Sequence, residues 1–269
     1  MGKTLVKDGS IVRKPGAFEK RIHEIDFIRG FLIALVVIDH ILCWFYQYGV
    51  DFPTRYWISP QRAIIRFIAL FLFVFISGVS TAFSKNNWVR AGQMLAFAGI
   101  LYVGSALLDY FLSDLIGTAI RVEFNIIAVL AWSTLFYCFA SGKTWRSLVI
   151  GLLISFLLSW YMVPNIKTYF VQHGITPNLA PLFDPWSFNH GYADWMPLFP
   201  FIMFFFMGAI FSYFYYVPTK KSLIKYRGNW ERPICFMGRH SLLIYAGHQL
   251  ILIPVFVALG PVISQHLGS

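Results

Sequence analysis

Residues 21–44 read RIHEIDFIRGFLIALVVIDHILCW, and this stretch contains most of the first expected membrane span. It begins with charged residues, becomes a long apolar run, and carries Asp39 and His40 well inside that run. Ionisable side chains are costly inside a membrane, so both are candidate catalytic residues. On a helix, the eleven residues from Arg29 to His40 span roughly 16 Å and close to three turns, so both side chains project from nearly the same side.

Each feature of this stretch also has a plainer interpretation. His40 can be a packing residue that hydrogen-bonds to a neighbouring helix. Because an unpaired histidine is costly in a membrane, a catalytic, gating or proton-handling role is about equally compatible with its position. Asp39 is turned about 100° away from His40 and does not orient it directly. Asp26 and Arg29 stand three residues apart and can pair with each other at the inner interface.

The composition of the whole chain indicates the class of protein. Of the 269 residues, 58 % are hydrophobic and only 13 % are charged, which is typical of a polytopic helical membrane protein embedded in a lipid bilayer. The net charge of +10 comes from basic residues between the apolar runs, so it gives no support to nucleic-acid binding. Three scattered cysteines form no disulfide framework, and no histidine cluster has the spacing of a metal site, so no metal is expected.

The hydropathy pattern predicts an all-α bundle with about seven spans. A basic cytoplasmic tail, 1–25, precedes a single transmembrane domain, 26–269. Basic residues concentrate at the connections that share a side with the N-terminus, which places the N-terminus inside and the C-terminus outside. The expected spans are 27–46, 62–84, 91–112, 121–140, 145–163, 197–217 and 241–260.

Two further segments carry candidate site residues. In GRHSLLIYAGHQ, 238–249, the side chains of Ser241, Tyr245 and His248 fall on one helical side, and Arg239 and His240 precede them at the inner mouth.

In ADWMPLFP, 193–200, Asp194 stands at the outer end of a span, where it can reach the level of His40. An Asp that stabilises a helix N-terminus explains Asp194 equally well. The long outer connection 164–196 is read either as a binding loop or as a lid over the bundle.

The order of four motifs resembles a known family. RIHEIDFIRGFLIALVVIDH, LFLFVFISGVSTAFS (70–84), ADWMPLFPFIMFFFMGAIF (193–211) and GRHSLLIYAGHQ are similar to those of bacterial membrane proteins of the heparan-α-glucosaminide N-acetyltransferase catalytic-domain family. The resemblance implies a multi-pass acetyltransferase of the inner cell membrane. Such an enzyme takes an acyl group from cytoplasmic acetyl-CoA and delivers it to an amine or hydroxyl of an extracytoplasmic sugar or glycan.

The resemblance also implies roles for individual residues. The catalytic candidates that it implies are His40, Asp194 and His248, and the ionisable Asp39 inside the same apolar run is a further candidate. The candidates for binding acyl-CoA that it implies are Arg29, Asp26, Arg239, His240 and Ser241, and Tyr245 is a further candidate because it shares a helical side with Ser241. Small relatives often carry Gly-Ile-Leu-His in the fourth span, whereas residues 125–128 here read NIIA, so it stays open which histidine is the base.

The sequence is also compatible with two other functions. Intramembrane Asp and His also mark proton-coupled transporters and channels, although we see no paired halves with interrupted helices. A non-catalytic scaffold of the same fold is the third reading. These patterns do not encode the acceptor, the acyl chain length, a covalent acyl-histidine intermediate or the oligomeric state. A homo-oligomer is compatible with them.

Overall fold

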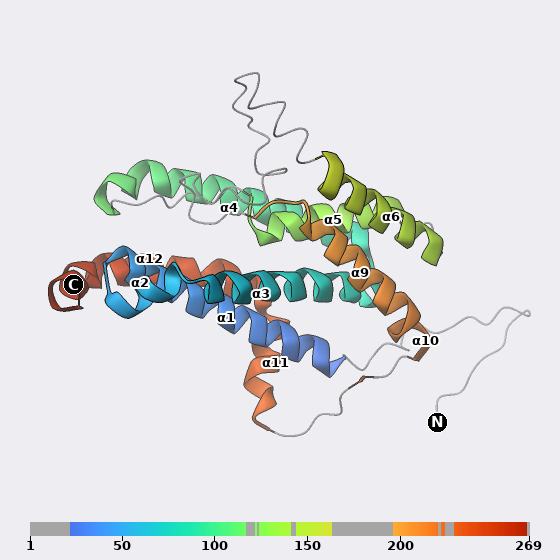
Figure 1. The fold of residues 1–269 in the computed structure, drawn as a ribbon, viewed down its shortest axis with the longest axis horizontal. Helices are drawn as coiled ribbons and strands as arrows, with labels where there is room; N and C mark the ends of the chain where they lie inside the picture. Colours follow the sequence, from blue (N-terminus) through green and yellow to red (C-terminus); the bar gives the residue numbers. More distant parts are fainter. Residues whose placement is uncertain are drawn as a thin grey trace, which may run out of the picture.

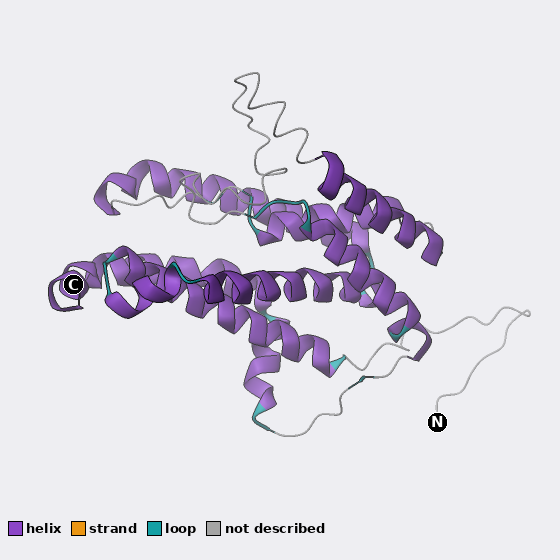
Figure 2. Cartoon of the chain, in the orientation of Figure 1, coloured by secondary structure: helices purple, strands orange, loops and turns teal. Residues whose placement is uncertain are grey.

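The computed structural model describes residues 22–116, 122, 124–140, 144–162, 196–219, 222–223 and 229–267. All regular elements in these ranges are helices, as Figure 2 shows, which confirms the all-α prediction. The helices are α1 (His23–Gln47), α2 (Asp51–Trp57), α3 (Pro60–Val79), η1 (Ser80–Phe83), α4 (Asn87–Ile116), α5 (Ile126–Ala140), α6 (Trp145–Leu157), η2 (Leu158–Met162), α9 (Phe201–Phe214), α10 (Tyr216–Thr219), α11 (Glu231–Arg239) and α12 (Ser241–Leu267).

Five segments of the described chain are long and apolar enough to cross a membrane. They run over His23–Gln47, Pro60–Phe83, Asn87–Phe111, Phe201–Thr219 and Ser241–Gly260. The two other predicted spans correspond to α5 and to α6 with η2, which are apolar but shorter. The total of seven spans and the orientation therefore stay predictions.

Local sequence signals explain where several helices begin. Ser59 accepts a hydrogen bond from the backbone N–H of Arg62, and Pro60 occupies the first helical position of α3, where its missing N–H costs nothing. The helix α9 begins at Phe201, directly after Pro200 and four residues later than the expected span 197–217. The short helices α2 and α11 were not predicted, because seven and nine residues with internal Pro and charged side chains look like connections.

The helices form two layers that α9 links (Figure 1). In the lower layer of that view α1 packs against α3, α11 and α12, and in the upper layer α4 packs against α5. The helix α9 packs against both α3 and α6. The core between the layers contains side chains that are fully or almost fully buried, among them Ile33, Val74, Val129 and Phe205. Burial of this apolar cluster holds the helices in their relative positions.

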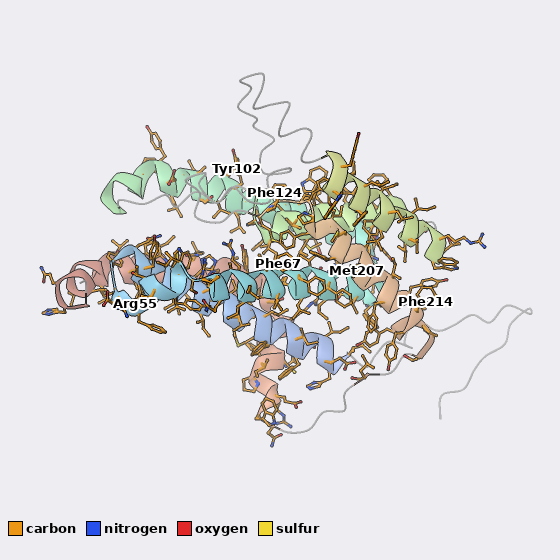
Figure 3. The ribbon with its side chains drawn as sticks, in the orientation of Figure 1. Arg55, Phe67, Tyr102, Phe124, Met207 and Phe214 are labelled. Atoms are coloured by element: carbon orange, nitrogen blue, oxygen red, sulfur yellow. The ribbon has the colours of Figure 1, made fainter. Side chains whose placement is uncertain are left out.

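The two ends of the bundle can be followed in Figures 1 and 3. The start of α1 and the helix α10 lie at the right, next to Phe214, whereas α2 with Arg55 and the end of α12 lie at the left. By the predicted orientation, the right-hand end is cytoplasmic.

Candidate functional site

Two histidines from distant parts of the chain meet between α1 and α12. The ring centroids of His40 and His248 lie 4.9 Å apart, with an angle of 59° between the ring planes. Both residues lie inside segments that are candidate membrane spans. The sequence identified each histidine separately, and packing of α12 against α1 brings the two side chains together.

The hydrogen bonds of His40 indicate which of its ring nitrogens carries the proton. The side-chain amide nitrogen of Gln249 lies 2.7 Å from His40 Nδ1. An amide N–H₂ group only donates, so Nδ1 accepts this bond, and a neutral ring then carries its proton on Nε2. His40 is therefore a hydrogen-bond donor through Nε2.

His248 has the opposite arrangement. Its Nδ1 lies 2.5 Å from the carbonyl oxygen of Tyr245 and 3.3 Å from that of Ile244. A carbonyl oxygen only accepts, so Nδ1 donates, and a neutral ring carries its lone pair on Nε2. The buried His248 is thus arranged as a base and the half-buried His40 as a donor.

Asp39 takes part in a different interaction. Its two carboxylate oxygens accept hydrogen bonds from Nε and Nη2 of Arg62 in α3, over 2.9 Å and 2.8 Å. The Arg62 guanidinium lies 3.3 Å from the ring centroid of Trp57, and Arg62 is buried. Asp39 thus joins α1 to α3 through Arg62, on a side of α1 that the turn of about 100° separates from His40. Whether Asp39 contributes to catalysis stays a prediction.

The residues that the sequence predicts at the inner mouth fall into two groups. Arg29 is half-buried; its Nη2 donates to Ser80 Oγ over 2.6 Å, and the guanidinium interacts electrostatically with Asp26, as the i,i+3 spacing predicts. Arg239 and His240 are instead exposed at the junction of α11 and α12. Arg29 therefore differs from Arg239 and His240 in its exposure to solvent, and whether the three residues share one binding site stays a prediction.

The remaining predicted residues of α12 lie on the side that faces the histidines. Tyr245 is buried, and its ring centroid lies 5.6 Å from that of His248. Ser241 is half-buried at the first position of the helix. Asp194 lies outside the described residues, so its predicted role stays untested.

Sequence reasoning missed a polar cluster at the start of α1. Glu231 Oε2 lies 2.6 Å from His23 Nε2, and Cys235 Sγ lies 3.4 Å from His23 Nδ1. Burial raises the pKa of the Cys235 thiol, and the nearby carboxylates of Asp26 and Glu231 raise it further. The only advance signal was the dense run of ionisable residues in RIHEIDF, which does not identify their partners in α11.

Glu24, also in the first turn of α1, holds this helix against the segment that follows α9. Its buried carboxylate accepts hydrogen bonds from the Tyr216 hydroxyl over 3.0 Å, from the Leu223 N–H over 2.6 Å, and from the Ser222 hydroxyl. Within the described part of the chain, no group of three or more His, Cys, Asp and Glu side chains is arranged to hold a metal ion.

Comparison with known proteins gives the family. The family model described as heparan-alpha-glucosaminide N-acetyltransferase, catalytic, matches residues 21–250, which include both histidine-bearing motifs. Searches of curated proteins and of solved structures gave no match. The family consists of transmembrane acetyltransferases. Because the match covers most of its length, the chain belongs to the heparan-alpha-glucosaminide N-acetyltransferase catalytic-domain family.

Proposed function

We propose that this protein is a membrane-embedded acyltransferase that moves an acetyl group from cytoplasmic acetyl-CoA to an amine or hydroxyl of an extracytoplasmic sugar or glycan. Membership of an acetyltransferase family supports the reaction class. The observation that carries the proposal is the pair of histidines within membrane-spanning helices, with one ring arranged as a donor and the other as a base. Such a pair is what proton transfer during acyl transfer needs.

The hydrogen bonds assign complementary roles to the two rings. His248 Nε2 takes the proton of the acceptor amine or hydroxyl as the acceptor's nitrogen or oxygen forms a bond to the thioester carbonyl carbon. His40 Nε2–H donates to the carbonyl oxygen, on which negative charge develops. The carbon–sulfur bond then breaks, and the CoA thiolate leaves and takes up a proton. Gln249 positions His40 by fixing which nitrogen carries the hydrogen.

The donor enters from the end of the bundle that contains Arg29. In the predicted orientation this end faces the cytoplasm, where acyl-CoA is found. The roughly 16 Å from Arg29 to His40 along α1 suits the extended pantetheine arm between the nucleotide and the thioester. The anionic nucleotide then stays among cationic groups while the acetyl group reaches the histidines.

The direction of transfer is tested with sealed vesicles. Inside-out and right-side-out membrane vesicles containing the protein are given labelled acetyl-CoA on one side and a soluble amino sugar on the other. We expect labelled sugar only when acetyl-CoA is on the cytoplasmic face, and only with the protein present. Proton flux without acetyl-CoA, together with no labelled product in either orientation, would support a transporter instead.

A further inference from the structure

A second arginine lies close to Arg29, and both contact the same end of α3. Arg90, in the first turn of α4, donates from Nη2 to Ser77 Oγ over 2.8 Å and to the Ser77 carbonyl over 3.3 Å. Arg29, in α1, donates to Ser80 Oγ over 2.6 Å. Ser77 and Ser80 are three residues apart, so they lie on one side of the end of α3. The two arginines therefore approach the same helical turn from two different helices.

Because Ser77 and Ser80 lie in one helical turn, the two guanidinium groups that they bind are near each other, and their like charges repel. Each lies in a segment that is a candidate membrane span, and each is half-buried. Asp26 supplies one negative charge near Arg29. Among the described residues, the salt bridges join other pairs, namely His23 with Glu231, Arg55 with Asp51 and Arg62 with Asp39. The guanidinium groups of Arg29 and Arg90 donate to uncharged hydroxyl and carbonyl oxygens, so this end of α3 has an excess of positive charge.

The hydroxyl groups account for only part of the hydrogen-bonding capacity of these arginines. Ser80 Oγ donates its own hydrogen to the carbonyl of Ile76 over 2.7 Å, so it serves Arg29 as an acceptor. Each guanidinium has five N–H donors in a planar fork, and each uses only Nη2 in the hydrogen bonds to these serines. The remaining donors suit a multivalent anion, and the fork geometry matches phosphate oxygens in particular.

We infer that Arg29 and Arg90, held by Ser80 and Ser77, form a binding site for phosphate groups, and that its ligand is the phosphate-bearing part of the acyl-CoA donor. The inference rests on the proposed function and adds Arg90, which no motif pointed out. A dianionic phosphate group between the arginines would offset the repulsion between them. The site lies about one pantetheine length from His40 along α1, so phosphate binding here would place the thioester at the histidines.

The test compares two donors that share the thioester and its arm and differ in the phosphorylated nucleotide. Acetyl-CoA carries phosphates, whereas S-acetylpantetheine has the same thioester and arm without them. For Arg90→Gln we expect KM for acetyl-CoA to rise about tenfold or more, the typical cost of a lost charge-assisted hydrogen bond, and KM for S-acetylpantetheine to be unchanged. Arg90→Lys, which keeps the charge but loses the fork, should fall between. Arg146→Gln removes an exposed arginine of α6 and is the matched control.

A binding measurement tests the phosphate site independently of the proposed acetyl-transfer reaction. CoA binding to the purified protein is measured by calorimetry, without turnover, for the wild type and for Arg90→Gln. Loss of CoA binding in the variant supports the site even if no acetyl transfer is found. Equal losses with acetyl-CoA and S-acetylpantetheine would show a structural role and overturn the inference. It would also be overturned if CoA binding persisted in Arg90→Gln while binding of inorganic phosphate or of phosphatidylglycerol vesicles was lost.

Discussion

The backbones of Gly30 in α1 and Gly238 in α11 lie directly against each other. A methyl group built on Gly30 would overlap the Ile234 carbonyl, and one built on Gly238 would overlap the carbonyl of Asp26. Because α12 begins two residues after α11 ends, this contact fixes where α12 starts beside α1. The glycine contact therefore helps to bring His248 to His40. A similar contact joins α3 to α9, through Gly78 and Gly208.

Alanine at the first contact should destabilise the protein. In Gly30→Ala the methyl group meets backbone atoms, which cannot move aside as a flexible side chain can, so we expect a loss of about 1–3 kcal/mol. Gly99→Ala, at an open position of α4, is the control and should be neutral or stabilising, because alanine favours a helix over glycine. Thermal unfolding in detergent checks both. Equal melting temperatures for the two variants would show that the helices do not approach as closely as described.

The ion pair between Asp39 and Arg62 should contribute to stability as a coupled unit. Removing one partner leaves a charge in a poorly solvated position, at a cost of about 3 kcal/mol. We therefore expect Asp39→Asn and Arg62→Gln each to destabilise strongly, and the double variant to lose much less than the sum of the two. A double-mutant cycle on unfolding free energies measures this coupling. Strictly additive losses would mean that the two side chains do not interact.

The Cys235 thiol should resist alkylation at mildly alkaline pH. Burial and two carboxylates raise its pKa, so at a given pH less thiolate is present than for an ordinary cysteine, and the alkylation rate should reach its midpoint above pH 9.0. The measurement uses a variant in which Cys43 and Cys138 are alanine. Glu231→Gln should lower the midpoint, because it removes one of the negative charges. A midpoint below that of a free thiol would contradict this assignment.

Much of the architecture could be predicted from the sequence. Apolar runs predicted the helices because a membrane requires each span to satisfy its own backbone, and the observed helices α1, α3, α4 and α12 overlap the expected spans. The two histidines were predicted for the same reason, since ionisable groups stand out against an apolar background.

The partners of these residues could not be predicted, because they depend on which helices pack together. Arg62 stands at the start of the expected span 62–84, and only the packing of α3 on α1 shows that it binds Asp39. Arg90 looked like a basic residue at a loop, and only the structure places it beside Ser77. Gln249 carries no charge and gave no sequence signal, although it contacts His40.

Gln249 should act by positioning His40. In Gln249→Glu the carboxylate can only accept, so His40 Nδ1 would have to carry a proton, and the cationic form of the ring would be favoured. We expect kcat to fall at neutral pH and the acidic limb of the pH–rate profile to move toward higher pH, because the neutral donor form of His40 would be reached only at higher pH. Gln249→Leu should lower kcat without that displacement. An unchanged pH profile in Gln249→Glu would remove Gln249 from the site.

The most direct test of the account is acetyl transfer from labelled acetyl-CoA by variants of the histidine pair. We predict that His40→Ala and His248→Ala each lose at least about a hundredfold in kcat, which is typical of a lost general acid or base, while the folded protein still binds CoA. His266→Ala, which removes an exposed histidine from the same helix as His248, is the matched control and should keep wild-type turnover. Wild-type turnover by either His40→Ala or His248→Ala would contradict the proposed active site.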